Sequence, residues 1–368
     1  MKIALVQDWF VVNGGAEKVV KEIVSIYPEI DIFSLVDFLS ESDRNYILNG
    51  KKSTTSFIQN LPFARSHYRT YLPFFPRAIE SLDFSGYDVI ISSSYAVAKG
   101  IRKTKDQIHI CYCHSPVRYA WDLEKEYLSR LSWLSKLISK QILKYIRKWD
   151  LSTTKGVDLF IANSNNVSER IKRIYNRDSI VIYPPVDTES FSPETNKSEY
   201  YFTTLRVVPY KKLDLIIETF NLLPNRKLIV AGEGPELQKI KKTAKSNIEF
   251  IGFVSKKELI SLMQKAKAFV LAAEEDFGIT SVEAQSCCTP VIAYKKGGYL
   301  ETVVDGKTGL FFNEQTTESL SEAILKLDAV RNTFTTHDFI ANAERFSIEK
   351  FRIKFKNCVN EYLAGKSK

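Results

Sequence analysis

Two acidic side chains in one segment have a spacing that suits sugar recognition. Glu275 and Glu283 are separated by seven residues in the run EEDFGITSVEA, which follows an apolar stretch. Carboxylates accept paired hydrogen bonds, so the two could hold neighbouring hydroxyls on a sugar and on a ribose. The plainer alternative is the ordinary enrichment of acids at a helix N-terminus, which the helix dipole favours.

A basic pair stands in a second loop. Arg206 and Lys211 are five residues apart, across a loop that contains Pro209. Arg would supply a fixed fork of donors and Lys a point charge, so the two together could grip one diphosphate. Taken alone, the segment is better explained as a solvated basic loop.

Glycines and a histidine complete the set of candidate residues. Gly14 and Gly15 stand at a predicted strand-to-helix turn, where backbone amides can approach an anion at the positive end of the helix. Such a turn alone is more often structural, and the G-x-G-x-x-G dinucleotide fingerprint is absent. His114 is one of four histidines. A lone His is more often a packed or surface residue, but this one follows a predicted strand directly.

The elements that must position these residues alternate between strands and helices, twice along the chain. Runs rich in Val, Ile and Phe, without strict polar alternation, predict strands buried on both faces, and hence two doubly wound α/β domains. Strands are expected at residues 2–7, 31–36, 87–94, 107–114, 157–164, 179–183, 200–204, 227–231, 248–253, 268–273, 290–294 and 309–312. Helices are expected at residues 17–27, 212–221, 256–267 and 348–363.

Two adjacent prolines, Pro184 and Pro185, mark the expected domain boundary, because they end a strand and stiffen the connection. We expect an N-terminal domain at 1–183, a C-terminal domain at 184–345, and a final helix at 346–368 that returns to the first domain. Ligands of open α/β sheets bind beyond the carboxyl ends of the strands. Two such domains facing each other would therefore form a cleft lined by the residues named above.

Composition limits the class of protein. The chain has 368 residues, 44% hydrophobic and 26% charged, which is typical of a globular protein of two domains. Its five cysteines show no C-x-x-C pair, which favours a reducing compartment. We find no signal peptide and no membrane span, so a cytoplasmic location is expected. The net charge of +9 suits nucleic acid, anionic lipid or simply a Lys-rich surface.

Together these segments resemble the retaining glycosyltransferases of family 4, which have the GT-B fold. The resemblance covers nearly the whole chain. Its motifs are GGAE near the start, His114, ANS at 162–164, the segment 183–187, Arg206 with Lys211, AGEGP at 231–235, Gly252, and the stretch from Glu275 to Glu301. Two usual glycines are replaced, by Leu205 and by Cys288, and we expect the local backbone contacts to differ there.

The resemblance implies a role for each candidate residue. Arg206 and Lys211 would bind the donor diphosphate, Glu283 the ribose, and Glu275 the transferred sugar, which His114 would also contact. The remaining donor-binding positions would act largely through their backbone: Gly14, Gly15, Gly232, Gly252, Phe253, Val254, Phe277, Gly278 and Ile279. The family typically needs no metal, and no Asp-x-Asp motif occurs here. No protein nucleophile is implied.

Finer similarities concern substrate and location. The segments at 6–9, 112–121 and 207–212 look most like bacterial mannosyltransferases of O-antigen or capsule assembly, which implies GDP-mannose as donor and a lipid-linked oligosaccharide as acceptor. Residues 130–149 begin with Arg130 and carry five further basic side chains on an amphipathic pattern: Lys136, Lys140, Lys144, Arg147 and Lys148. Such a helix can lie on an anionic inner membrane, or it can simply pack on its own sheet.

Alternatives to this assignment remain open. The donor could be a UDP-sugar, or the chain could be a nucleotide-sugar epimerase on the same fold. A non-enzymatic nucleic-acid binder has no supporting motif, so no nucleic-acid partner is expected.

Overall fold

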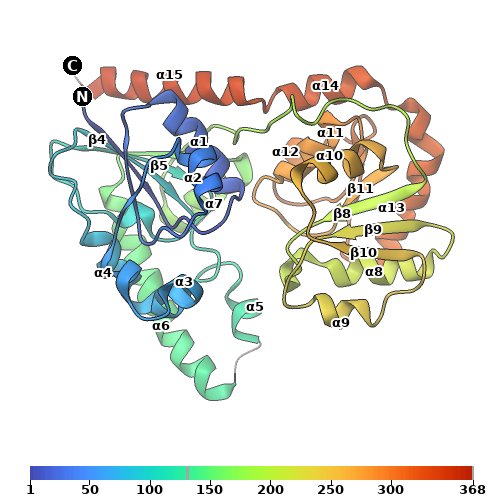
Figure 1. The fold of residues 1–368 in the computed structure, drawn as a ribbon, viewed down its shortest axis with the longest axis horizontal. Coiled ribbons are helices and arrows are strands. Elements are labelled where there is room, and N and C mark those ends of the chain that lie inside the picture. The colour runs from blue at the N-terminus through green and yellow to red at the C-terminus, as the bar shows by residue number, and fades with distance from the viewer. Residues whose placement is uncertain (130–131, 367–368) are drawn as a thin grey trace. The chain divides into compact units, whose positions relative to one another are not determined.

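The computed structural model describes residues 1–129 and 132–366, which form two compact units. The first unit comprises Met1–Pro185 together with the chain from Phe351 onward, and the second comprises Val186–Lys350 (Figure 1). Each unit is a parallel sheet with helices on its faces, so the predicted class of two doubly wound α/β domains is confirmed. Within the described chain, no helix has both the length and the apolarity to cross a bilayer.

The first unit contains a seven-stranded parallel sheet in the order β3-β2-β1-β4-β5-β6-β7. Its strands are β1 Ile3–Gln7, β2 Asp31–Ser34, β3 Thr54–Thr55, β4 Val89–Ser94, β5 Ile108–Cys113, β6 Leu159–Ala162 and β7 Ile180–Val181. Its α-helices are α1 Gly15–Ile26, α2 Glu41–Leu48, α3 Ala64–His67, α4 Phe75–Glu80, α5 Glu124–Ser129, α6 Trp133–Thr153 and α7 Asn165–Tyr175. Four short 3₁₀ helices join them: η1 Phe57–Asn60, η2 Tyr68–Phe74, η3 Ala98–Gly100 and η4 Thr154–Gly156.

The second unit contains a six-stranded parallel sheet in the order β10-β9-β8-β11-β12-β13. Its strands are β8 Tyr200–Thr204, β9 Lys227–Ala231, β10 Ile248–Gly252, β11 Ala268–Leu271, β12 Val291–Tyr294 and β13 Gly309–Phe312. Its helices are η5 Pro209–Lys211, α8 Leu213–Leu222, α9 Leu237–Lys241, α10 Lys256–Lys265, α11 Ile279–Ser286, α12 Tyr299–Thr302, α13 Thr317–Val330, η6 Arg331–Thr333 and α14 Thr336–Glu344.

The apolar runs form the buried strands because both faces of each sheet are covered by helices. All six residues of β4 and all four of β11 are buried, which is the pattern expected of a parallel sheet covered on both sides. The edge strand β3 is not among the expected strands, because its two threonines form no apolar run. Several strands are shorter than expected, because their last predicted residues lie in the loops that leave the sheet.

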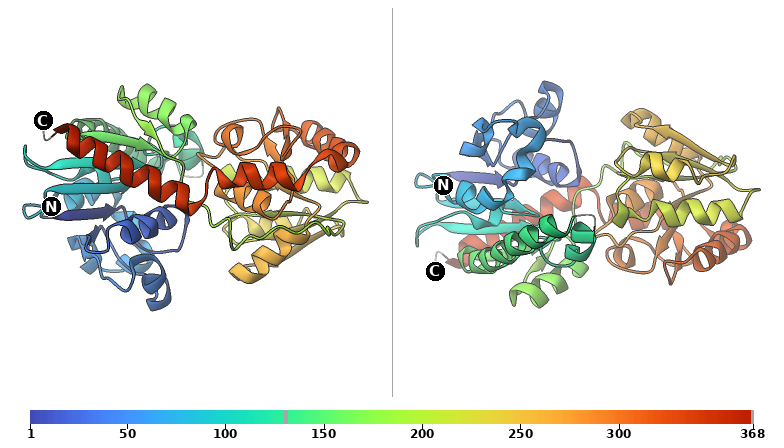
Figure 2. Two further views of the ribbon diagram at one scale, coloured as in Figure 1. Left: turned by 90° about the horizontal axis from the view of Figure 1, so that it is seen from above. Right: turned by 90° about the horizontal axis from the view of Figure 1, so that it is seen from below.

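The long helix α15 (Ile348–Lys366) completes the core of the first unit. Phe351, Phe355 and Val359 are buried in one cluster with Leu5 and Val19, from the opposite end of the sequence. Viewed from above, α15 lies across the strands of this unit (Figure 2). The first unit is therefore built from both ends of the chain.

The chain order reverses once in each sheet, and this reversal locates the favoured binding position. In the second unit the chain runs outward from β8 through β9 to β10, then returns to β11 on the other side of β8. The corresponding reversal in the first unit lies between β1 and β4. Loops that leave such neighbouring strands diverge to opposite faces of the sheet, which opens a crevice at their carboxyl ends.

Candidate functional site

Lys211 and Glu275 meet at the strand-order reversal of the second unit. Lys211 ends η5 in the loop after β8, and Glu275 lies in the loop after β11. The Lys211 ammonium forms an ion pair with the Glu275 carboxylate, and the two side chains retain 24% and 19% exposure. Two residues that were predicted from separate segments are thus in contact, on a half-buried edge that a ligand can reach.

Arg206 lies two residues after β8, so a second cationic residue stands at the same end of the sheet. Its side chain is exposed, and within residues 1–129 and 132–366 it has no ion pair. The loop that carries it is braced by the loop after β9: the Leu205 amide donates to Ala231 O at 3.2 Å and the Val207 amide to Glu233 O at 2.8 Å. The backbone beneath Arg206 is therefore fixed while its guanidinium remains available.

Gly232 and Gly252 lie next to each other on the β9 side of the reversal. The Gly232 amide donates to Gly252 O at 2.7 Å. Gly232 has a φ of +119°, and a Cβ there would stand 2.0 Å from Leu205 O. Glycine is therefore required at 232 by the approach of the β8 loop. Beyond Gly252, Phe253 leaves 81% of its side chain exposed.

The segment from Glu275 to Ile279 is held by the loop after β12. The Gly298 amide donates to Glu275 O at 2.8 Å, and Lys296 pairs with Glu274 at 3.0 Å. Gly278 is the N-cap of α11 and has a φ of +89°. A Cβ at this position would lie 2.5 Å from the Tyr299 ring. The first turn of α11 begins at Ile279, four residues after Glu275, and this helix end can receive an anion or an oxygen dipole.

Two other predicted residues have buried side chains. Phe277 packs on Phe346 with ring centroids 5.3 Å apart, so only its backbone can serve a ligand. Glu283 lies in the second turn of α11 and is 3% exposed. Any contact of Glu283 with a ribose would be made by a carboxylate edge at the wall of the site.

Leu205 and Cys288, which replace two usual glycines of the family, lie in two different local structures. The Leu205 side chain packs against the core cluster of the second unit, and the close contact falls on Gly232 instead. Cys288 has a φ of +55°. It follows the C-cap Cys287 of α11, and the amides of Cys288 and Thr289 donate to Gln285 O and Ala284 O at 2.8 and 3.0 Å. This is a Schellman ending, in which the left-handed position favours glycine.

In the first unit His114 stands directly after β5, as the sequence predicts. Its Nε2 lies 2.8 Å from Ser93 Oγ, and its ring packs edge-on against Tyr95 and Tyr112. Asn163 Nδ2 donates to His114 O at 3.0 Å. The imidazole is therefore oriented by β4 and its backbone by β6, with the ring half-buried.

Two buried acids hold backbone amides in the first unit, Glu17 in the Gly14–Gly15 turn and Asp8 in the loop after β4. Asp8 follows β1 and accepts four consecutive amides, from Tyr95 to Ala98, at 2.5–3.0 Å. Glu17 Oε2 accepts the Gly14 amide at 3.0 Å, as the third-position acid of a capping box does. Burial raises the pKa of Asp8 to about 6 and that of Glu17 to about 7. The Gly14 amide is consequently already bonded, and the amides of 95–98 are saturated from within.

Asp8 and Glu17 are not among the predicted site residues, although the sequence holds a signal for each. Asp8 is an acid directly after an apolar strand, and Glu17 is three residues beyond the N-cap Gly14, the spacing of a capping box. Among the described residues, no group of three or more His, Cys, Asp or Glu side chains is arranged to hold a metal ion.

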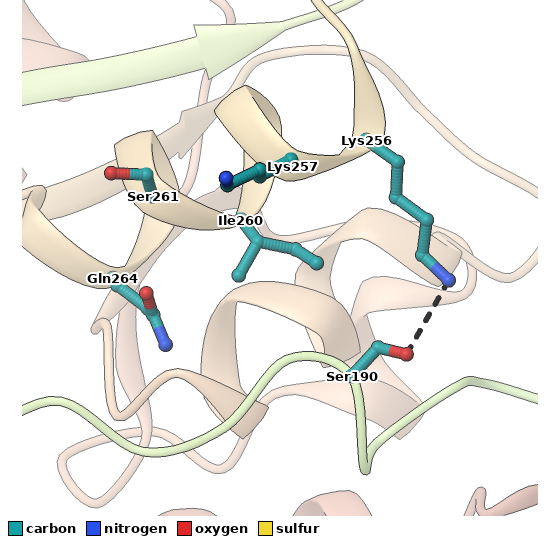
Figure 3. Close-up of a pocket in the computed structure, with 6 residues that line it drawn as sticks. All are labelled: Ser190, Lys256, Lys257, Ile260, Ser261 and Gln264. Atoms are coloured by element: carbon teal, nitrogen blue, oxygen red, sulfur yellow. Dashed lines mark hydrogen bonds between the residues drawn. The ribbon is translucent and has the colours of Figure 1, made fainter.

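A separate open depression lies elsewhere on the second unit. It is lined by Ser190 and by five residues of α10, namely Lys256, Lys257, Ile260, Ser261 and Gln264, and Lys256 Nζ lies 3.4 Å from Ser190 Oγ (Figure 3). None of the predicted site residues lines it. We therefore take the strand-order reversal, not this depression, as the candidate site.

Comparison with solved structures defines the class of fold. The Anabaena protein HepE, solved in complex with UDP-glucose, aligns with a TM-score of 0.72 over 98% of this chain and all of that chain, at 16% identity. Sucrose-phosphate synthase from Thermosynechococcus elongatus aligns with a TM-score of 0.75 at 16% identity, over 99% of this chain and 100% of that one. The two parallel-sheet domains are those of the GT-B fold.

Comparison of sequences then gives the family. The model for glycosyltransferase family 4 matches residues 14–190, and that for glycosyl transferases group 1 matches residues 185–346. An uncharacterized glycosyltransferase of Methanocaldococcus jannaschii is 31% identical over 291 residues, which are 75% of this chain and 79% of that protein. The chain belongs to the glycosyltransferases of the family 4 type.

Two relatives with named activities match over shorter stretches. A probable sucrose-phosphate synthase of Thermosipho melanesiensis is 30% identical over 51% of this chain and 47% of its own length. A GDP-mannose-dependent phosphatidylinositol monomannoside mannosyltransferase of Mycolicibacterium smegmatis is 28% identical over 38% of this chain and 44% of its own length. In both cases the match covers about half of the relative or less.

Proposed function

We propose that this enzyme transfers a hexose from a nucleoside diphosphate sugar to a saccharide acceptor, with retention of the anomeric configuration. The observation that carries the proposal is the contact of Lys211 with Glu275 at the strand-order reversal of the second unit. It joins a phosphate-binding cation to a hydroxyl-binding carboxylate at the start of α11. A sugar diphosphate needs both kinds of partner, next to each other.

In this proposal the donor replaces the internal ion pair. The diphosphate takes Lys211 and the free guanidinium of Arg206, and the released Glu275 carboxylate accepts hydrogen bonds from sugar hydroxyls. The first-turn amides of α11, beginning at Gly278, face the same group. On the other side of β8, Gly232 and the loop of Gly252, Phe253 and Val254 receive the base, while Glu283 meets the ribose.

The chemical step then follows from charge. The bond between the anomeric carbon and the donor phosphate oxygen breaks, and the acceptor oxygen bonds to that carbon from the same face. The acceptor proton passes to the departing phosphate oxygen. Lys211 and Arg206 stabilise the charge that grows on the nucleoside diphosphate, the part that a divalent cation plays in other transferases. We propose that no metal is required and that no residue acts as nucleophile.

We assign acceptor recognition to the first unit, with His114 contacting the transferred sugar and the Gly14–Gly15 turn bordering phosphate or acceptor. The acceptor is a lipid-linked saccharide of bacterial surface polysaccharide assembly, used on the cytoplasmic face of the inner membrane. All five cysteines are buried thiols, which supports a reducing compartment.

GDP-mannose is the donor that we propose. Its support is the similarity of segments 6–9, 112–121 and 207–212 to bacterial mannosyltransferases, and the partial match to a GDP-mannose-dependent enzyme. The UDP-glucose complex of the HepE structure, at 16% identity, makes UDP-glucose the competitor to test.

The site is tested by two substitutions with matched controls. Lys211→Ala and Glu275→Ala should each lower the rate of donor turnover roughly 100-fold or more, because each removes charge that acts on the transition state. The control pair is Lys227→Ala and Glu249→Ala, an exposed ion pair of 2.8 Å in the same unit. These controls should keep the wild-type rate, and all four variants should keep a wild-type melting temperature. Near-normal turnover in both site variants would refute the assignment.

The donor is tested by release of nucleoside diphosphate in a panel of sugar nucleotides, with and without chelator. We expect GDP release from GDP-mannose only when an acceptor is present, and equal rates with chelator. Turnover of UDP-glucose but not of GDP-mannose would reject the proposed donor. Loss of activity with chelator would reject metal independence, and release without any acceptor would favour a hydrolase or epimerase.

A further inference from the structure

The first turns of α6 present apolar side chains to solvent. The buried residues of this helix, Leu143, Ile146, Trp149 and Asp150, all lie in its second half. In the first half Trp133, Leu134, Leu137 and Ile138 are exposed, Trp133 by 70%. Trp133 and Leu137 are four positions apart, as are Leu134 and Ile138, so each pair shares one face of the helix. In Figure 1 these turns extend away from the sheet of the first unit.

A row of cations runs beside this apolar face. Lys136, Lys140 and Lys144 follow one another at a spacing of four residues, and the sequence from 132 to 149 contains no acid. None of the three lysines forms an ion pair with another described residue. The first residue of the predicted basic segment, Arg130, lies outside the described residues. Helix α6 begins at Trp133.

A second exposed segment has the same character. Phe63, at the N-terminus of α3, exposes 80% of its side chain and has a φ of +55°, an unfavourable backbone for a bulky residue. Phe74 at the end of η2 is also exposed, as are Arg65 and Arg69 between them. Residues 57–79 contain no acid. In Figure 1, α3 and the first turns of α6 lie at the same end of the first unit, opposite α15.

We propose that this basic-aromatic surface, made of residues 63–74 and 133–144, binds the surface of an anionic lipid bilayer. Exposed Trp, Phe and Leu side chains suit the boundary between headgroups and acyl chains, and lysines at the edge of the apolar face reach anionic headgroups. A two-fold contact between copies of this surface would set the same lysine row against itself. The inference does not require the proposed transfer reaction.

The charges are tested by sedimentation with phosphatidylcholine vesicles that contain or lack phosphatidylglycerol. The protein should bind only the anionic vesicles, and less as salt rises. The variant Lys136→Gln/Lys140→Gln/Lys144→Gln should partition about a hundredfold more weakly, since each lysine near the surface contributes about fivefold to the affinity. The control Lys239→Gln/Lys242→Gln/Lys326→Gln removes three exposed charges from the second unit and should bind as the wild type does.

The apolar contribution is tested with Trp133→Ser and Phe63→Ser, which should each weaken binding several-fold. Leu222→Ser, at a side chain of the second unit that is 63% exposed, should not. Binding to neutral vesicles alone, equal loss in both lysine triples, or a dimer that Trp133→Ser dissolves would overturn the proposal. Because no donor is present, such a failure would leave the proposed transfer untouched.

Discussion

Two buried carboxyl groups near the strand-order reversal of the first unit, those of Asp8 and Glu17, are costly to ionise. Asp8, after β1, and Glu17, in α1, are both buried. Each carboxylate is hydrogen-bonded mainly to backbone amides. Burial raises the pKa of Glu17 to about 7, against a value near 4.5 in the unfolded chain. The folded protein therefore holds a proton that the unfolded chain releases, and stability is lost as pH rises through this range.

Glu17→Gln should consequently change stability in a pH-dependent way. Gln keeps an acceptor for the Gly14 amide and has no charge to desolvate. The free energy of unfolding of the variant, relative to wild type, should rise by roughly 2 kcal/mol between pH 5 and pH 8. Urea denaturation across this range measures it. The exposed Glu29→Gln should give a flat difference, and a flat difference for Glu17→Gln would show that its carboxyl is not buried as described.

At the scale of elements, the end of α11 explains a departure from the family pattern. Cys288 occupies the left-handed position of a Schellman motif, while the preceding Cys287 has a φ of −81°. At 288 a Cβ is strained, so Cys288→Gly should be more stable than Cys288→Ala by about 1 kcal/mol.

The neighbouring cysteine provides the control. At Cys287 the order should reverse, with Gly less stable than Ala by roughly 0.5–1 kcal/mol, because no strain offsets the lost backbone entropy. Chemical denaturation of the four variants decides. The same order at both positions would contradict the assigned backbone conformation.

The sequence predicted most strands because burial on both faces leaves a continuous apolar run, as in β4 and β11. It placed His114 and Glu275 at strand ends for the same reason. It did not predict the short helices η1, α3 and η2 at residues 57–74, where Pro62 and Pro73 interrupt any helical period. Nor could spacing alone give the contact of Lys211 with Glu275, because it depends on β8 and β11 being neighbours in the sheet.

At the scale of the whole molecule, each unit has its own apolar core, so each should respond to ligand separately. GDP binding to the second unit should slow amide hydrogen exchange in β8, β11 and α11, by about 2.7 kcal/mol of added stability at a hundredfold excess over Kd. Strands of the first unit should change far less. Mass spectrometry of peptic peptides resolves the two units, and protection confined to the first would contradict the assignment of the donor to the second.

Helix α15 has a consequence for how the protein is made. Phe351, Phe355 and Val359 fill the core of a unit whose first strand begins at Ile3. A ribosome delivers those three side chains only after the entire second unit has been translated. The second unit can therefore fold while the first unit still lacks α15 and leaves part of its apolar core exposed. During synthesis the second unit should complete folding before the first, and chaperones should hold the nascent amino-terminal half until α15 emerges.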